Sequence, residues 1–144
     1  MKVSLGVAAL VLVGVLVAAG GSSRPTSAPL HQRMAVAARK LTLAMDDALP
    51  AKTALVYGPA SYPVALHAWN AHAQPPRRQT GAWYVIVVQG RFVWHGPFRP
   101  SRGSFAARIW SPAPANSGIG FSGLSAKLPA RLGRLGSPIS ISLR

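Results

Sequence analysis

The pattern of apolar and polar positions along the chain separates it into four parts. Residues 5–21 read LGVAALVLVGVLVAAGG and carry no charge, and a short polar segment rich in serine and proline follows them. Beyond this segment, apolar residues first recur with helical spacing and then with the alternation of strands. The predicted parts are a signal peptide or membrane anchor (1–20), a linker (21–29), an amphipathic helix (30–50) and a small α+β domain (51–144).

The N-terminal segment has the composition of an export signal. Lys2 precedes the apolar run, and the small residues Val17 and Ala19 stand three and one positions before a cut at Gly20. Cleavage would leave a mature N-terminus near Gly20 or Gly21. The alternative is an uncleaved anchor, because about 17 apolar residues is the lower limit for spanning a bilayer. Both alternatives predict an extracytoplasmic protein, either secreted or anchored in the membrane.

The first helix is predicted between Leu30 and Pro50. Its apolar residues recur at steps of three and four, and Ser27 is a candidate N-cap. Arg33 lies early and Asp46 lies late, so these charges oppose the helix dipole and the helix needs tertiary packing. A membrane-surface helix is the alternative, which the alanine content and the lack of aromatic anchors disfavour. The apolar stripe consists of Leu30, Met34, Ala38, Leu41 and Met45.

A short strand and a second helix are predicted next. Thr53–Tyr57 has strand character, and Gly58-Pro59 is expected to close the strand. Ser61 and Pro63 open a helix, because proline is tolerated in the first turn. Its inner stripe is predicted to be Tyr62, Leu66, Trp69 and Ala73.

The segment from Ala82 to Gln89 is apolar at every position before its final glutamine, so neither face of the corresponding strand is polar. Such a strand is expected to be buried on both sides, in the middle of a sheet. Gly90 is either a hairpin turn or a bulge within one strand that runs to Trp94. The bulge is favoured because Gln-Gly is a weak hairpin signal.

Three further strands complete the expected fold. Phe105–Trp110 is followed by a turn, and Ile119–Ser125 is expected to pair back with it. The terminal SPISISLR alternates, with Ile139, Ile141 and Leu143 on one face and serines on the other, which predicts an edge strand. The fold class is therefore α+β: a signal or anchor helix, then one or two helices packed on an antiparallel sheet of about four strands.

The order of these motifs resembles that of a group of small exported proteins. A helix is followed by the strand YVIVVQGRF, a proline-rich loop, and the segments GIGFSGLS and LGRLGSPIS. This order resembles exported proteins of Gram-positive bacteria with a PepSY-like or cystatin-like α+β domain, and it covers residues 51–144. SPAPANSG stands where that group has an acidic turn. The resemblance implies a topology and an extracytoplasmic location, but no activity, because none is established for the group.

The charge is strongly one-sided. Sixteen lysines and arginines face two acids, Asp46 and Asp47, which gives a formal net charge of +14. Outside the cytoplasm the available polyanions are lipid head groups and wall polymers, whereas specific nucleic-acid binding is disfavoured. The alternative is that an arginine-rich composition simply covers a solvated surface. The chain has no cysteine, which excludes disulfides, thiolate zinc sites and a cysteine nucleophile.

Residues that could support catalysis are scarce. Two adjacent carboxylates cannot form the spaced pair of a glycosidase or most metal sites. His67 and His72 are five positions apart, which places them about 140° apart on a helix. No Gly-x-Ser-x-Gly elbow is present, and GIGFSG lacks the Gly-Lys-Ser/Thr ending of a phosphate loop. We therefore expect no enzyme activity, no cofactor and no metal.

A cluster of basic and aromatic residues is the strongest functional signal. Aromatic faces separated by arginines can grip phosphates and stack rings, although the aromatic residues are equally expected as core residues. This cluster contains Arg91, Phe92, Trp94, His95, Phe98, Arg99 and Arg102. The candidate anion-binding residues, in or beside the loops that flank the central strand, are Arg77, Arg78, Arg91, Arg99 and Arg102.

These observations leave one leading hypothesis and one alternative. The leading hypothesis is an exported, non-enzymatic cell-envelope module that binds anionic polymer or phospholipid through a basic surface. The alternative is a PepSY-like protein-interaction or peptidase-inhibitor domain whose partner is an exported protein.

Overall fold

The computed structural model describes residues 29–45, 52–75, 79–97, 99–116 and 120–144. The predicted signal or anchor and most of the predicted linker lie outside these ranges. Within them, no helix has both the length and the apolar character needed to cross a membrane.

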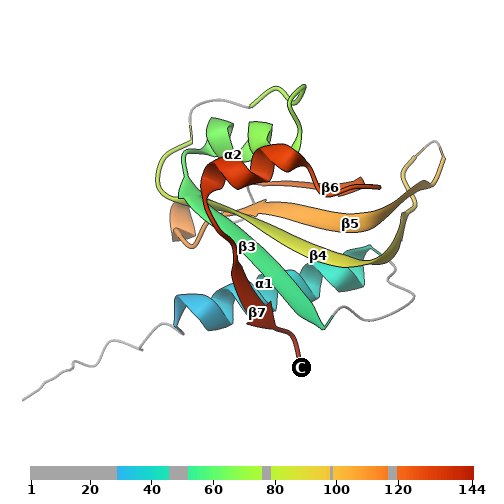
Figure 1. Cartoon of the computed structure of the whole chain (residues 1–144), viewed down its shortest axis with the longest axis horizontal. Helices are drawn as coiled ribbons and strands as arrows, with labels where there is room; N and C mark the ends of the chain where they lie inside the picture. Colours follow the sequence, from blue (N-terminus) through green and yellow to red (C-terminus); the bar gives the residue numbers. More distant parts are fainter. Residues whose placement is uncertain (1–28, 46–51, 76–78, 98, 117–119) are drawn as a thin grey trace, which may run out of the picture.

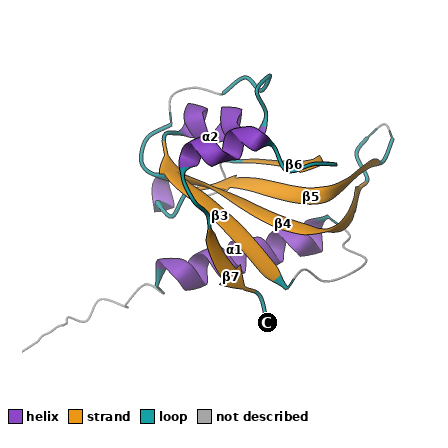
Figure 2. Ribbon diagram, viewed as in Figure 1, coloured by secondary structure: helices purple, strands orange, loops and turns teal. Residues whose placement is uncertain are grey.

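A five-stranded antiparallel sheet forms the centre of the fold (Figure 2). The order of its strands is β6-β5-β4-β3-β7, so β7 pairs with β3, the last described strand with the first described strand. The α+β class is confirmed, with five strands where about four were expected. The strands are β3 (Thr53–Ala60), β4 (Trp83–Trp94), β5 (Ser101–Trp110), β6 (Phe121–Ser125) and β7 (Ile139–Ser142).

Helices cover both faces of the sheet (Figure 1). One face carries α1 (Leu30–Ala44), and the other carries α2 (Tyr62–Trp69) together with the 3-10 helix η2 (Ala130–Leu135). A short 3-10 helix, η1 (Pro114–Asn116), follows β5. Each face has its own hydrophobic cluster, so the sheet is the middle layer of three.

Strand β4 is the buried centre of the sheet. It pairs with β3 on one side and with β5 on the other. Ile86 lies in the α1 cluster and Val87 in the α2 cluster, which confirms the prediction of a strand buried on both faces. The strand continues through Gly90 to Trp94, with a register shift between Gln89 and Phe92. The preference for a bulge over a hairpin turn is therefore confirmed.

The inner stripe of α1 packs on the sheet, as predicted. Met34, Ala38, Leu41 and Met45 are buried in the α1 cluster, whereas Leu30 is 40% exposed. Small alanine side chains along this stripe let the helix lie close to the strands.

Helix α1 begins at Leu30, as predicted, but its predicted N-cap and its predicted C-terminal end are wrong. The N-cap is Pro29 rather than Ser27, because proline has a fixed φ and disfavours helical backbone in the residue before it. The helix stops at Ala44 instead of continuing to Pro50. After it, the Met45 carbonyl accepts a hydrogen bond from the Val93 amide of β4, 3.2 Å away. A hydrogen bond to β4 therefore replaces the next turn of the helix at this point. Asp46 and Asp47 lie outside the described residues.

Two strands are longer than predicted. β3 continues past Gly58-Pro59, because Gly58 adopts φ +120° and the pairing with β4 shifts register there. β5 begins at Ser101 instead of Phe105, because its first residues pair with the far end of β4. Part of the expected arginine-rich loop is therefore strand.

The second helix begins as predicted, with Ser61 at the N-cap and proline in the first turn. Tyr62, Leu66 and Trp69 are buried against the sheet, whereas Ala73 lies beyond the end of the helix. Tyr62 contacts Trp83 edge-on, with ring centroids 4.5 Å apart. Burial raises the pKa of the Tyr62 hydroxyl above its usual value.

The predicted edge strand is confirmed, since β7 closes one side of the sheet. Ile141 is buried in the α1 cluster, and Leu143 packs against the same cluster. Ile139, expected on the same buried face, is 51% exposed because it lies at the outer end of this short strand.

Candidate anion-binding site

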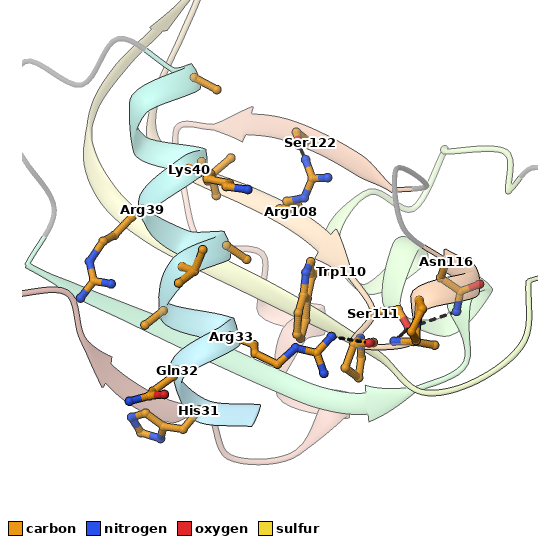
Figure 3. A pocket seen from close by; sticks show the side chains of 18 of the residues that line it. His31, Gln32, Arg33, Arg39, Lys40, Arg108, Trp110, Ser111, Asn116 and Ser122 are labelled. Atoms are coloured by element: carbon orange, nitrogen blue, oxygen red, sulfur yellow. Dashed lines mark hydrogen bonds between the residues drawn. The ribbon is translucent and has the colours of Figure 1, made fainter. Parts of the chain in front are cut away.

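A groove with a volume of about 1210 Å³ runs along α1. One wall is the helix, and the other is formed by β5, β6 and the segment 111–116 that follows β5. Ser142 of β7 borders the groove on the other side of the helix. We refer to this hollow as the α1 groove (Figure 3).

Lys40 of α1 and Arg108 of β5 project into the α1 groove from opposite walls (Figure 3). Arg108 lies two residues from both Ala106 and Trp110, which contact the α1 cluster, so alternation along the strand places it on the same face. Its Nη1 donates a hydrogen bond to the Ser122 hydroxyl of β6 at 3.3 Å. Two cations from elements far apart in sequence thus share one hollow.

A third cation, Arg33, is held in place at the same groove. Its guanidinium carbon lies 5.8 Å from the ring centre of Trp110, and its Nη2 donates a hydrogen bond to the Pro112 carbonyl. Trp110 in turn contacts Tyr84, with ring centroids 6.3 Å apart. Because a guanidinium carries five N–H donors, Arg33 keeps donors beyond the one given to Pro112. The aromatic ring here orients a cation, which leaves less of its face for stacking on a ligand.

The polar residues at the end of the groove have a structural role. Asn116 Nδ2 donates to the Thr80 carbonyl at 2.9 Å and to the Ser111 hydroxyl at 3.1 Å. Both side chains are buried, and these bonds give the Asn116 amide hydrogens acceptors within the protein. They fix the segment that carries Pro112, and so they fix the acceptor that positions Arg33.

The charged side chains among the described residues that line the groove are all basic. The described residues contain twelve lysines and arginines and neither an aspartate nor a glutamate. No carboxylate side chain in these ranges can therefore pair with Lys40 or Arg108. Arg39 also borders the groove, but its side chain points away from the other three cations (Figure 3). It donates its Nε hydrogen to the Leu143 carbonyl at 3.2 Å and an Nη2 hydrogen to an oxygen of the C-terminal residue, Arg144, at 3.4 Å.

The structure describes three of the five arginines suggested by the sequence, and these three lie outside the α1 groove. Arg77 and Arg78 are outside the described residues. Arg91 on β4, Arg102 on β5 and Arg99 in the loop between these strands are exposed at the loop end of the β4–β5 hairpin, and none of them lines the α1 groove.

Sequence reasoning missed the three cations that the fold does bring together. Arg33 and Lys40 were seen only as part of a helix, and Arg108 only as part of a strand. A usable signal was present for Arg108, because it interrupts the apolar segment FAARIW and its side chain must leave the core. Nothing in the sequence indicated which element it would face.

The aromatic members of the predicted basic-aromatic cluster have different environments. Phe92 is 1% exposed and belongs to the α1 cluster, so it is a core residue. Trp94 is 48% exposed, and Phe98 lies outside the described residues.

The α1 groove has the chemistry of an oxyanion site. Guanidinium and ammonium groups bind phosphate through charge and multiple N–H donors. In the described part of the chain, no three histidine, aspartate or glutamate side chains gather as metal ligands would. No family model, curated protein or solved structure matches this chain.

Proposed function

We propose that this protein is a non-enzymatic, extracytoplasmic module that binds phosphate-bearing anions, either wall polymer or phospholipid head groups, through a basic surface centred on the α1 groove. One observation carries the proposal. Arg33, Lys40 and Arg108 converge on a single groove, and no carboxylate side chain of the described residues is available to neutralise them.

The structure of the groove supports phosphate as the common ligand chemistry. Arg33 is oriented by Trp110 and Pro112, and Arg108 by Ser122, so two of the three cations lose little conformational freedom on binding. The open shape of the groove along a helix suits a chain or a surface of phosphates better than a small enclosed ligand. The predicted export of the chain places such polyanions within reach.

Binding to inorganic polyphosphate and to phosphatidylglycerol vesicles tests the proposal and distinguishes the two sources of phosphate. Three double variants of equal charge change are compared. Lys40→Glu with Arg108→Glu alters the groove, Arg99→Glu with Arg102→Glu alters the hairpin, and Lys127→Glu with Arg134→Glu alters exposed cations outside both. Arg33 stays unchanged because it also holds Pro112.

The groove variant is expected to lose at least about ten-fold more affinity for polyphosphate than the Lys127/Arg134 control, about 1.4 kcal/mol. Wild-type binding should weaken steeply as salt rises to about 0.15 M, where exposed charges are screened within about 8 Å. Equal losses of affinity in all three variants would show that binding depends on the general surface charge and not on the groove. No binding of either phosphate source at low salt would reject the proposal.

A second candidate function rests on the open sheet edge. Among the described residues, β6 (Phe121–Ser125) pairs only with β5, so its other side can accept a strand from a protein partner. This feature supports the PepSY-like interaction or peptidase-inhibitor alternative. Co-purification of an exported protein that the Lys40→Glu, Arg108→Glu variant retains would favour it.

A further inference from the structure

The outward side of α1 carries apolar residues in addition to its buried inner stripe. Val36 is 48% exposed and Leu43 is 80% exposed, and they are seven positions apart, so they lie on the same side of the helix. Arg39 and Lys40 stand between them and are also exposed. We call these four residues the α1 ridge.

The end of β4 lies beside the C-terminal end of α1. The Val93 amide donates to the Met45 carbonyl at 3.2 Å, which places the end of the strand beside the end of α1. Trp94 is the next residue after Val93, and Leu43 comes two residues before Met45. A 48% exposed tryptophan and an 80% exposed leucine therefore lie close to one junction.

We infer that the α1 ridge and Trp94 form a membrane-docking surface that inserts Leu43 and Trp94 into the interface of an anionic phospholipid bilayer. The inference rests on the proposed function, and of the two sources of phosphate named there it selects the phospholipid head groups. Lys40 belongs both to the ridge and to the α1 groove, so head-group phosphates beside the inserted leucine would meet the groove cations.

Charge and apolarity together favour a bilayer over a soluble polyanion. Exposed leucine and valine gain nothing from contact with a soluble phosphate polymer, whereas burial in a bilayer interface removes their apolar surface from water. Tryptophan is enriched at the membrane interface because its ring is apolar and its N–H is polar. Lysine and arginine beside these residues complement anionic head groups.

The length of the preceding chain is compatible with this docking. Eight residues, 22–29, separate the apolar segment 5–21 from the start of α1. Even a fully extended chain of eight residues spans at most about 29 Å. If residues 5–21 anchor the protein, α1 therefore starts within this distance of the bilayer.

A site-specific label on the full chain tests the inference. Because the chain has no cysteine, Leu43→Cys creates a unique thiol for an environment-sensitive fluorophore. Val64→Cys is the matched control, because Val64 is 53% exposed on α2, across the sheet from α1. Both proteins are mixed with vesicles of phosphatidylcholine alone and of phosphatidylcholine with an equal part of phosphatidylglycerol, and polyphosphate binding is measured on the same samples.

The label at Leu43 should shift to the blue and be quenched by lipid-attached quenchers in the anionic vesicles only, and the label at Val64 should not. Adding Lys40→Glu should weaken binding to the anionic vesicles, followed by this shift, at least about five-fold, since about 1 kcal/mol is expected for each basic residue near an anionic surface.

A water-exposed label at Leu43 in anionic vesicles, or an equal shift at Val64, would overturn the inference. If polyphosphate still bound in that case, the proposed function would stand. If polyphosphate also failed to bind, both would fall. A shift that appears without vesicles and grows with protein concentration would assign the ridge to contact between two copies of the chain, and would also overturn the inference.

Discussion

Gly58 shows how one residue permits a long strand where the sequence indicates a break. Its φ is +120°, and a Cβ added there would lie 2.8 Å from the Trp83 carbonyl oxygen of β4. Residues with side chains rarely adopt this conformation. The glycine therefore allows β3 to continue through an irregular pair and to present Ala60 to β4.

Gly58→Ala is expected to lower the free energy of unfolding by about 1 to 3 kcal/mol, because it adds backbone strain and a contact with a rigid carbonyl. Denaturant unfolding measures the change. Gly133→Ala is the matched control, since a Cβ there meets nothing within 4 Å, and its effect should stay within about 0.5 kcal/mol. Equal effects at the two glycines would contradict this explanation.

The candidate site also depends on single residues whose partners are remote in sequence. Arg33 and Pro112 are 79 positions apart, and Arg108 bonds to a serine 14 positions away. The residue types that bind phosphate were visible in the sequence, and the strong positive charge made an anionic ligand a natural hypothesis. Which cations would meet was not visible, because a charge on a strand or helix has no partner until the elements pack.

Strand β4 links the two hydrophobic clusters of the molecule. Residues on its alternate faces contact α1 and α2, and both of its edges are hydrogen-bonded over its first half. Opening this strand would expose both clusters at once. Its amides are therefore expected to exchange only when the whole domain unfolds.

Native-state hydrogen exchange should show the amides of Val85–Val88 among the slowest in the chain. The amides of β7, an edge strand of four residues, should exchange faster through local opening. Exchange of the Val85–Val88 amides as early as those of β7 would contradict the central role of β4.

Helix α1 carries apolar residues on two sides, one buried and one exposed. Its inner stripe, predicted from spacing, is buried against the sheet. Its outer side carries Val36 and Leu43, which the periodicity of the inner stripe left unassigned. Packing, one of the two alternatives that the sequence offered for this helix, is confirmed for the inner stripe, and membrane contact by the outer side stays a prediction.

The excess of positive charge affects the whole molecule. A net charge of +14 repels itself within a chain of 144 residues, and no carboxylate side chain of the described residues offsets it. Self-repulsion disfavours a compact state and weakens as salt shortens the screening length.

The thermal midpoint should therefore rise when sodium chloride increases from about 0.01 M to about 0.15 M, as the screening length falls from about 30 Å to about 8 Å. Differential scanning calorimetry measures the change. The Lys127→Glu, Arg134→Glu variant should show a smaller rise, because its net charge is lower. An unchanged or lower midpoint in the wild-type protein would show that charge repulsion contributes little to its thermal stability.

The sequence by itself determined the features that depend on neighbours along the chain. Helical spacing placed the inner stripe of α1, and the apolar run at Ala82–Gln89 indicated a strand buried on both faces. The weak turn signal at Gly90 pointed correctly to a bulge. These features follow from local periodicity and backbone preference, which a short segment already contains.

Only the tertiary structure decided the features that depend on contacts between remote segments. The Met45–Val93 hydrogen bond joins the end of α1 to β4, and pairing with β4 lengthened β3 and β5 beyond their predicted ends. The convergence of Arg33, Lys40 and Arg108 on one groove likewise required a helix and a strand to pack face to face. A residue's type and spacing fix what it can bind, but its partners are set by packing across the sheet.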